Sequence, residues 1–136
     1  MKKLFLFLAF LLLFATSINS QAQVVTLFMC ERYDEVAGPI GAGGVFTTGY
    51  LTTVAVCSEK MYYDNIFIQY DKLGSDGQYY FYKRFPFTFP NGYSTVYFSR
   101  VGDNDMEFND VGVYRVFLLD KYLQTIAYIT VTIVGR

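Results

Sequence analysis

The chain contains no histidine, and this absence restricts its chemistry more strongly than any residue that it does contain. Histidine is the base in Ser-His-Asp and Cys-His catalytic units, a common zinc ligand, and the usual proton carrier near neutral pH. The two cysteines, Cys30 and Cys57, are too few for a four-thiolate zinc site. We therefore expect no cofactor and no catalysis that depends on histidine.

Catalysis by a pair of carboxylates remains possible. Glycoside hydrolases use a pair of them, one on each side of the bond that is cleaved. Six acidic residues could supply such a pair, and their spacing selects no two of them: Asp64, Asp71, Asp103, Asp105, Glu107 and Asp110. A carboxylate-dependent hydrolase is therefore kept as an alternative to a non-catalytic protein.

Four of these acids lie close together in the sequence and could bind calcium: Asp103, Asp105, Glu107 and Asp110. Hard cations need several oxygen ligands on a short flexible segment, which this loop offers. It departs from the EF-hand pattern, because its sixth position is Phe108 and its twelfth is Tyr114, where that pattern has glycine and glutamate. Two interpretations stay open, a calcium site at the edge of the fold or a solvated loop that keeps the edge soluble.

Tyrosines gather in the segment Tyr79-Tyr80-Phe81-Tyr82, and Tyr62 and Tyr63 precede it in the sequence. Side chains alternate along a strand, so either Tyr80 and Tyr82 or Tyr79 and Phe81 must point away from the core. Exposed tyrosines are favoured at interfaces, where an apolar ring meets water. We predict that the five tyrosines form a ligand platform; the alternative is that loops or a second sheet cover both faces of the strand.

The first 22 residues have the pattern of a secretory signal peptide. Lysines at positions 2 and 3 precede an apolar run from Leu4 to Phe14, and Ser20 and Ala22 occupy positions −3 and −1 of the expected cleavage site. The run of 11 apolar residues would span about 16 Å as a helix, against a hydrocarbon core of about 30 Å. We predict export to the periplasm, the cell surface or the medium, with no membrane span after the signal is removed.

The remaining residues, 23–136, have the length of a single domain. Removing the two signal lysines from 11 basic residues leaves 9, against 12 acidic residues, so the net charge is −3. Nucleic acids and anionic membranes bind clustered lysines and arginines, so this balance argues against both as partners.

An exported chain with two cysteines suggests a disulfide between Cys30 and Cys57. If strands 24–30 and 51–57 are antiparallel neighbours, Cys30 lies opposite the start of the second strand and Cys57 at its end. Their separation is then roughly 20 Å, beyond the limit of about 7 Å between Cα atoms for a disulfide. A bridge requires these strands to be parallel or to lie in different sheets, and otherwise the two are buried free thiols.

Period-two alternation of apolar residues predicts strands throughout the mature chain, and no segment after the signal predicts a helix. Gly74-Ser75-Asp76-Gly77 is a hairpin turn, and the segment around Pro86 and Pro90 is an edge strand or a crossing between sheets. Residues 31–48 read as a long loop with a short edge strand near Val45 and Phe46. We expect seven strands: 24–30, 51–57, 65–71, 78–84, 95–101, 113–119 and 126–134.

The spacing Asp110-x-Gly112-x-Tyr114-x-Val116 resembles the start of the second-last strand in immunoglobulin-like sandwiches. The resemblance implies that the Tyr114 hydroxyl bonds back to the backbone at a corner, and that Val116 stands where antibody domains have their second core cysteine. Residues 49–56 resemble the turn and second strand of that fold. The core tryptophan and the antibody-type disulfide are absent. The implied fold is an all-β, immunoglobulin-like Greek-key sandwich of about seven strands.

These observations favour an exported, non-catalytic module that binds a protein or a surface glycan through its tyrosines or through loops at one end. The hydrolase is one alternative. The other is a structural subunit of a cell-surface assembly, which an unpaired strand edge or concentration-dependent oligomers would indicate.

Overall fold

The segments with alternating apolar residues become strands in the computed structural model, which describes residues 24–99 and 106–136. No helix occurs in these described ranges, so the all-β prediction is confirmed. It follows that nothing in the described part is a helix long and apolar enough to cross a membrane. The strands are β1 (Val25–Cys30), β2 (Arg32–Asp34), β3 (Gly38–Ile40), β4 (Val45–Thr47), β5 (Gly49–Tyr50), β6 (Thr52–Met61), β7 (Asn65–Leu73), β8 (Tyr79–Thr88), β9 (Tyr93–Phe98), β10 (Glu107–Phe108), β11 (Gly112–Asp120) and β12 (Thr125–Val134).

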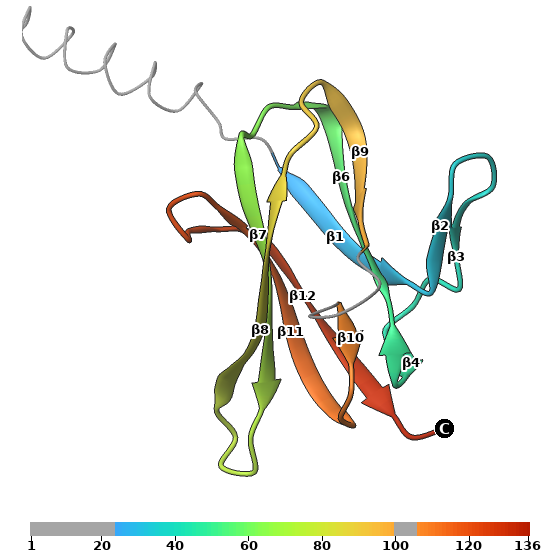
Figure 1. The fold of residues 1–136 in the computed structure, drawn as a ribbon, viewed down its shortest axis with the longest axis vertical. Coiled ribbons are helices and arrows are strands. Elements are labelled where there is room, and N and C mark those ends of the chain that lie inside the picture. The colour runs from blue at the N-terminus through green and yellow to red at the C-terminus, as the bar shows by residue number, and fades with distance from the viewer. Residues whose placement is uncertain (1–23, 100–105) are drawn as a thin grey trace, which may run out of the picture.

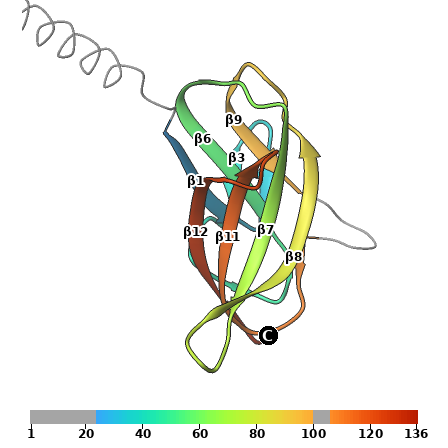
Figure 2. The ribbon, with the colours of Figure 1, turned by 90° about the vertical axis from the view of Figure 1, so that its left-hand side faces the viewer.

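Two sheets pack face to face and form a β-sandwich (Figure 1). One has three strands in the order β1-β6-β9, and the other has five in the order β4-β12-β11-β7-β8. Neighbouring strands are antiparallel except β4, which runs parallel to β12. Figure 2 looks onto the five-stranded sheet. Two short antiparallel pairs, β2 with β3 and β5 with β10, lie outside these sheets.

The core is a continuous apolar cluster between the two sheets. On β7 and β11 the inward residues are spaced by two, as a half-buried strand requires. The largest fully buried side chains include Tyr70, Phe108 and Tyr114. Tyr70 stacks on Phe108 with ring centroids 4.3 Å apart, and Phe108 meets Tyr114 edge-on at 4.9 Å.

Tyr114 forms the corner hydrogen bond that the resemblance implies. Its hydroxyl donates to the backbone carbonyl of Asp110 at 2.7 Å, while the ring is fully buried. Gly112 allows this approach: its φ of +150° disfavours other residues, and a Cβ there would lie 3.0 Å from Cε of Lys72. The backbone is therefore fastened to the core at the start of β11.

The expected strands are observed, with differences at their ends and in the loops. β6 continues to Met61, beyond the predicted end at Cys57. β8 runs through Pro86 to Thr88, which is tolerated because β8 is the edge of its sheet. The predicted loop 31–48 contains β4 as expected but also the β2–β3 hairpin, which was not predicted. The predicted signal peptide, residues 1–22, lies outside the described residues.

Tyr114→Phe and Tyr70→Phe should differ in their effect on stability although both remove one buried hydroxyl. The first change deletes the corner hydrogen bond, and we expect a loss of about 1–2 kcal/mol in the free energy of unfolding. The Tyr70 hydroxyl has no hydrogen-bond partner among the described residues, and the nearby Thr53 hydroxyl donates to Sδ of Met29 at 3.1 Å. Its removal should leave stability unchanged or raise it by up to about 1 kcal/mol. Urea denaturation measures both, and equal losses would contradict the assignment.

Stability should fall with pH above about 10. Burial raises the pKa of Tyr70 and of Tyr114 above the usual value of 10.0. Above that pH the unfolded chain releases phenolic protons that the folded chain keeps, so the free energy of unfolding falls by about 1.4 kcal/mol per pH unit for each tyrosine. Urea denaturation between pH 9 and pH 11 (roughly the range in which free phenols titrate) measures the slope. Tyr70→Phe should make it shallower, and an unchanged slope would show that Tyr70 does not contribute.

Candidate binding surface

The tyrosine-rich strand β8 presents Tyr79 and Phe81 on the outer side of the five-stranded sheet. Phe81 pairs with Asp71 of β7, and Tyr79 pairs with Leu73. Phe81 is 61% exposed and Tyr79 is half-buried. Of the two alternatives that strand alternation allowed, the structure therefore selects Tyr79 and Phe81.

Tyr82 lies on the inner side because β8 has a bulge. Tyr70 pairs with Lys83 and the next residue, Asp71, pairs with Phe81, so Tyr82 is the extra residue between them. Its ring packs edge-on against Tyr114 with centroids 5.2 Å apart, and its hydroxyl donates to the carboxylate of Asp110 at 3.3 Å. Tyr82 thus supports the corner and does not lie on the same side of the sheet as Tyr79 and Phe81.

Tyr80 is 53% exposed but is bound to its own hairpin turn. Its hydroxyl donates to the carboxylate of Asp76. This hydrogen bond raises the pKa of Tyr80 and lowers the pKa of Asp76. The Asp76 carboxylate also accepts from the backbone N–H of Gln78 at 3.0 Å. We conclude that Tyr80 stabilises the turn.

Tyr62 and Tyr63 lie at the other end of β7, so the five predicted tyrosines do not form one platform. They occupy the β6–β7 turn, whereas Tyr79 follows the β7–β8 turn, and β7 spans about 26 Å at 3.3 Å per residue. Tyr62 is 65% exposed. Tyr63 packs edge-on against Phe89, with ring centroids 5.4 Å apart.

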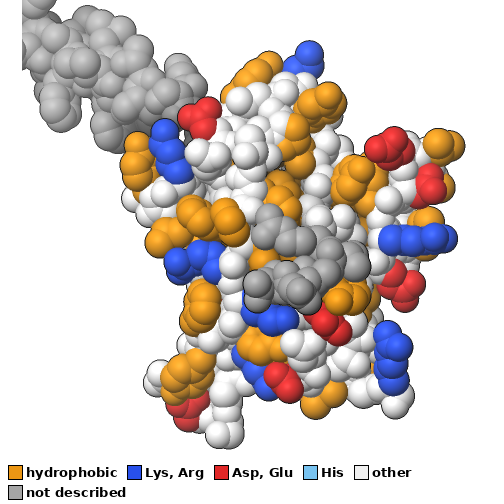
Figure 3. Space-filling model, viewed as in Figure 1, with side chains coloured by type: hydrophobic (Ala, Val, Ile, Leu, Met, Phe, Trp, Pro, Cys, Tyr) orange, Lys and Arg blue, Asp and Glu red, His pale blue; other side chains and the backbone are white. Residues whose placement is uncertain are grey.

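The structure instead gathers aromatic and arginine side chains on the outer side of the five-stranded sheet. We call this set the aromatic surface, and its members are Tyr79, Phe81, Arg84, Arg115, Phe117 and Tyr128. The guanidinium carbon of Arg115 lies 4.0 Å from the ring centroid of Tyr79 and 5.8 Å from that of Tyr128. Arg84 lies 5.3 Å from the ring centroid of Phe81. Figure 2 looks onto this sheet, and in Figure 3 hydrophobic and basic side chains follow the side on which β7 and β8 lie.

Hydrogen bonds hold the centre of the aromatic surface. Nε of Arg84 donates to Oε1 of Gln69 at 2.8 Å, and the Gln69 amide donates to Asp71 at 2.8 Å. Arg115 is the cross-strand partner of Asp71, and its buried Nε has no hydrogen-bond partner among the described residues, so its position rests on the rings of Tyr79 and Tyr128. Phe117 and Tyr128 are also directly opposite each other, with ring centroids 5.6 Å apart. Side chains fixed in this way lose little conformational entropy when a partner binds.

The outward orientation of Arg115, Phe117 and Tyr128 can be inferred from the sequence by strand alternation. Val116 was expected to face the core, so its neighbours Arg115 and Phe117 had to face outward. The closing hairpin then places Tyr128 opposite Phe117. Their proximity to Tyr79 could not be foreseen, because it depends on β7 lying between β11 and β8.

The acidic residues do not assemble into a site within the part of the chain that the structure describes. Asp103 and Asp105 fall outside that part. Glu107 is half-buried in β10, and the exposed Asp110 accepts the hydrogen bond from Tyr82. In the described ranges no three acidic or cysteine side chains are grouped so that they could hold a metal ion. Calcium binding therefore remains a prediction.

Asp64 and Asp71 do not form a catalytic pair. They stand at opposite ends of most of β7, roughly 23 Å apart at 3.3 Å per residue, whereas catalytic carboxylates are about 5–10 Å apart. Asp64 lies 3.6 Å from Nζ of Lys121, in an exposed ion pair. The hydrolase alternative thus has no support from these two residues.

The two cysteines are free and buried, so the disulfide that the sequence left open is not formed. β1 and β6 are antiparallel neighbours, with Cys30 opposite Thr52 and Val25 opposite Cys57. The thiols are therefore five residues apart along the ladder, about 17 Å. Burial raises the pKa of Cys30, whose thiol donates weakly to the carbonyl of Thr52 at 3.8 Å.

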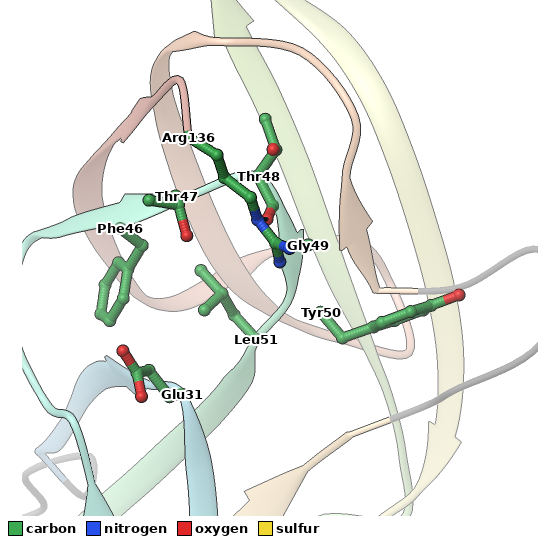
Figure 4. Close-up of a pocket in the computed structure, with 8 residues that line it drawn as sticks. All are labelled: Glu31, Phe46, Thr47, Thr48, Gly49, Tyr50, Leu51 and Arg136. Atoms are coloured by element: carbon green, nitrogen blue, oxygen red, sulfur yellow. Dashed lines mark hydrogen bonds between the residues drawn. The ribbon is translucent and has the colours of Figure 1, made fainter.

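A small pocket lies where β4 and β5 meet the C-terminal residue (Figure 4). Its volume is about 280 Å³. Glu31 and Arg136 stand at opposite ends of it in Figure 4, and Nε of Arg136 donates to the carbonyl of Thr48 at 3.2 Å. Gly49 makes room for Arg136, because a Cβ at Gly49 would lie 3.2 Å from Nη2. Among the described residues that line it, the pocket has one acid and one base.

The chain matches no family model, no curated protein and no solved structure.

Both thiols should be unreactive in the folded protein and reactive after unfolding. We expect no alkylation by iodoacetamide of the native chain, because Cys30 and Cys57 are buried, and two alkylations per chain in urea without reductant. Mass spectrometry of the intact chain counts the alkyl groups. Absence of alkylation in urea, relieved by reductant, would reveal a disulfide and contradict the observed register.

Proposed function

We propose that the protein is an exported, non-catalytic binding module with an immunoglobulin-like fold, and that its aromatic surface contacts the partner. Export rests on the signal pattern of residues 1–22. The absence of histidine from the sequence supports the non-catalytic assignment.

The strand order supports the immunoglobulin-like assignment. In variable-type domains the first, second, fourth and fifth strands share one sheet, and the sheet of the last two strands also contains the third and extra strands. The orders β1-β6-β9 and β4-β12-β11-β7-β8 resemble this division, with three strands in the first sheet instead of four. The hydrogen bond from Tyr114 to Asp110 lies at the matching corner. The missing tryptophan and the free cysteines argue against an antibody-like subtype.

The observation that carries the binding proposal is the aromatic surface. Four rings and two arginines share the outer side of one sheet, with Phe81 61% and Tyr128 58% exposed. Tyrosine and arginine are enriched among the residues that dominate binding energy, and a guanidinium over a ring keeps both in fixed positions. Exposed rings in such an array bury large apolar areas on contact with a partner.

A protein fits this surface better than a glycan does. Phe81 and Phe117 have no hydroxyl to hydrogen-bond a sugar, and the chain contains no tryptophan. The hydroxyls of Tyr79 and Tyr128 make a surface glycan the second candidate, since they supply polar groups beside a ring.

Phe81→Ser and Tyr128→Ser should each weaken partner binding by about tenfold or more, because each removes an exposed ring of the aromatic surface. The matched controls are Tyr62→Ser and Tyr122→Ser, whose rings are 65% and 74% exposed on turns away from this surface. Tagged mature protein is cross-linked to its native envelope fraction, and captured proteins are quantified by mass spectrometry.

The proposal holds if one dominant partner is lost with the surface variants and kept with the controls. Equal loss with Tyr62→Ser would place the contact elsewhere. A partner retained by the double variant Phe81→Ser, Tyr128→Ser would exclude the aromatic surface, and arrays of surface glycans would then be probed with the same variants.

A further inference from the structure

The outer edge of β9 is an open sheet edge. Within the described residues, β9 pairs with β6 on one side and with no strand on the other. Such an edge presents a row of backbone N–H and C=O groups to which another strand can add. It belongs to the three-stranded sheet, so it is separate from the aromatic surface.

β9 also lacks the devices that usually block an edge. Its six residues, from Tyr93 to Phe98, include no charge and no proline. One edge strand of the other sheet, β8, contains Lys83, Arg84 and Pro86, which oppose strand addition. Its other edge strand, β4, has only three residues, Val45–Thr47. The outer side of β1 is partly closed by a bridge from Met29 to Gly43 and lies against β12. Among the edges of the described residues, that of β9 is thus the most suited to pairing.

We propose that β9 pairs with β9 of a second copy of this chain, antiparallel about a two-fold axis beside Thr95. In this register Thr95 faces its own equivalent, and Tyr93 faces Tyr97 of the second copy. The three residues are spaced by two and therefore lie on one side of the sheet. Thr–Thr and aromatic–aromatic pairs are among the favourable cross-strand pairs. The sheet β1-β6-β9 becomes one continuous sheet of twice as many strands.

Charge supports a copy of this chain as the occupant. A two-fold axis places each residue near its own equivalent, so a charge on the strand would meet a like charge. None of the six residues of β9 is charged, so the strand itself brings no like charges together at such an axis. A groove of about 380 Å³ runs beside the strand, lined by Pro90, Tyr93, Thr95, Val96 and Tyr97.

Two tyrosines of the proposed contact, Tyr93 and Tyr97, have exposed ring area, and Tyr97 is already held in one orientation. Tyr93 is 60% exposed and Tyr97 is 39% exposed, so both rings have area left to bury. Tyr33 stacks on Tyr97 with ring centroids 4.6 Å apart, and the Tyr97 hydroxyl donates to Glu35 at 3.3 Å. The orientation of Tyr97 is therefore set before a second copy arrives, which lowers the entropy cost.

The length of the edge sets the strength of the association. Six residues extend about 20 Å, and a contact of that length buries less than the roughly 1,200 Å² found in stable complexes. The dimer is therefore weak and depends on protein concentration.

The experiment is sedimentation velocity on the mature chain, residues 23–136, from about 10 µM to about 1 mM. The variants are Thr95→Lys and Thr95→Glu, each alone and as an equimolar mixture. Each alone places like charges opposite one another and should weaken dimerisation by about tenfold or more, whereas the mixture places opposite charges together and should restore it. Tyr122→Lys and Tyr122→Glu, on an exposed turn, are the matched controls and should dimerise as the wild type does.

Three outcomes would overturn the proposal. One is a wild-type chain that stays monomeric at every concentration. Another is dimerisation that Thr95→Lys leaves unchanged, or that the mixture fails to restore. The third is a monomeric chain whose captured partner is lost with Thr95→Lys, which would assign the edge to an extended segment of another protein. The double variant Phe81→Ser, Tyr128→Ser should dimerise normally, so failure of this pairing is distinguished from failure of the aromatic surface.

Discussion

The buried aromatic cluster around Phe108 is the contact on which the arrangement of this protein depends. Phe108 lies between Tyr70 of β7 and Tyr114 of β11, and Tyr70 also meets Phe85 of β8 edge-on with centroids 5.6 Å apart. These rings bury roughly 150–250 Å² each, which matters in a small chain whose two cysteines are free. The cluster joins β7, β8, β10 and β11, and the hydrogen bond from Tyr114 to Asp110 fastens the backbone beside it.

The bulge at Tyr82 connects this core to the surface. One extra residue in β8 lets Tyr82 turn inward against Tyr114 while Tyr79 and Phe81 stay on the outside. Without the bulge, side chains would alternate strictly between the two sides of the sheet along the whole of β8. The same irregularity therefore supplies a ring to the corner and leaves two rings for the aromatic surface.

Much of the architecture could be predicted from the sequence, because half-buried strands carry a clear period of two. The β7–β8 and β11–β12 hairpins follow from local patterns. The antiparallel pairing of β1 with β6, which separates the cysteines, is non-local and was left open. The β2–β3 hairpin was missed, since Gly38, Pro39 and Gly41 read as loop residues. The structure does not bring the five predicted tyrosines together, for two physical reasons. A bulge leaves no periodic pattern in the sequence by which it could be predicted. In addition, the whole length of β7 separates Tyr62 and Tyr63 from Tyr79 at the start of β8.

The two proposed contact regions are compatible because they belong to different sheets. Pairing through β9 extends the three-stranded sheet sideways and leaves the outer side of the five-stranded sheet uncovered. A two-fold dimer would then carry two aromatic surfaces at a fixed spacing. Two linked sites bind a repetitive or clustered partner more tightly than either site alone, by about 10²–10⁴-fold when both can engage. A weak dimer forms mainly where the chain is concentrated, so at a surface dense in partner, binding and pairing would reinforce each other by mass action.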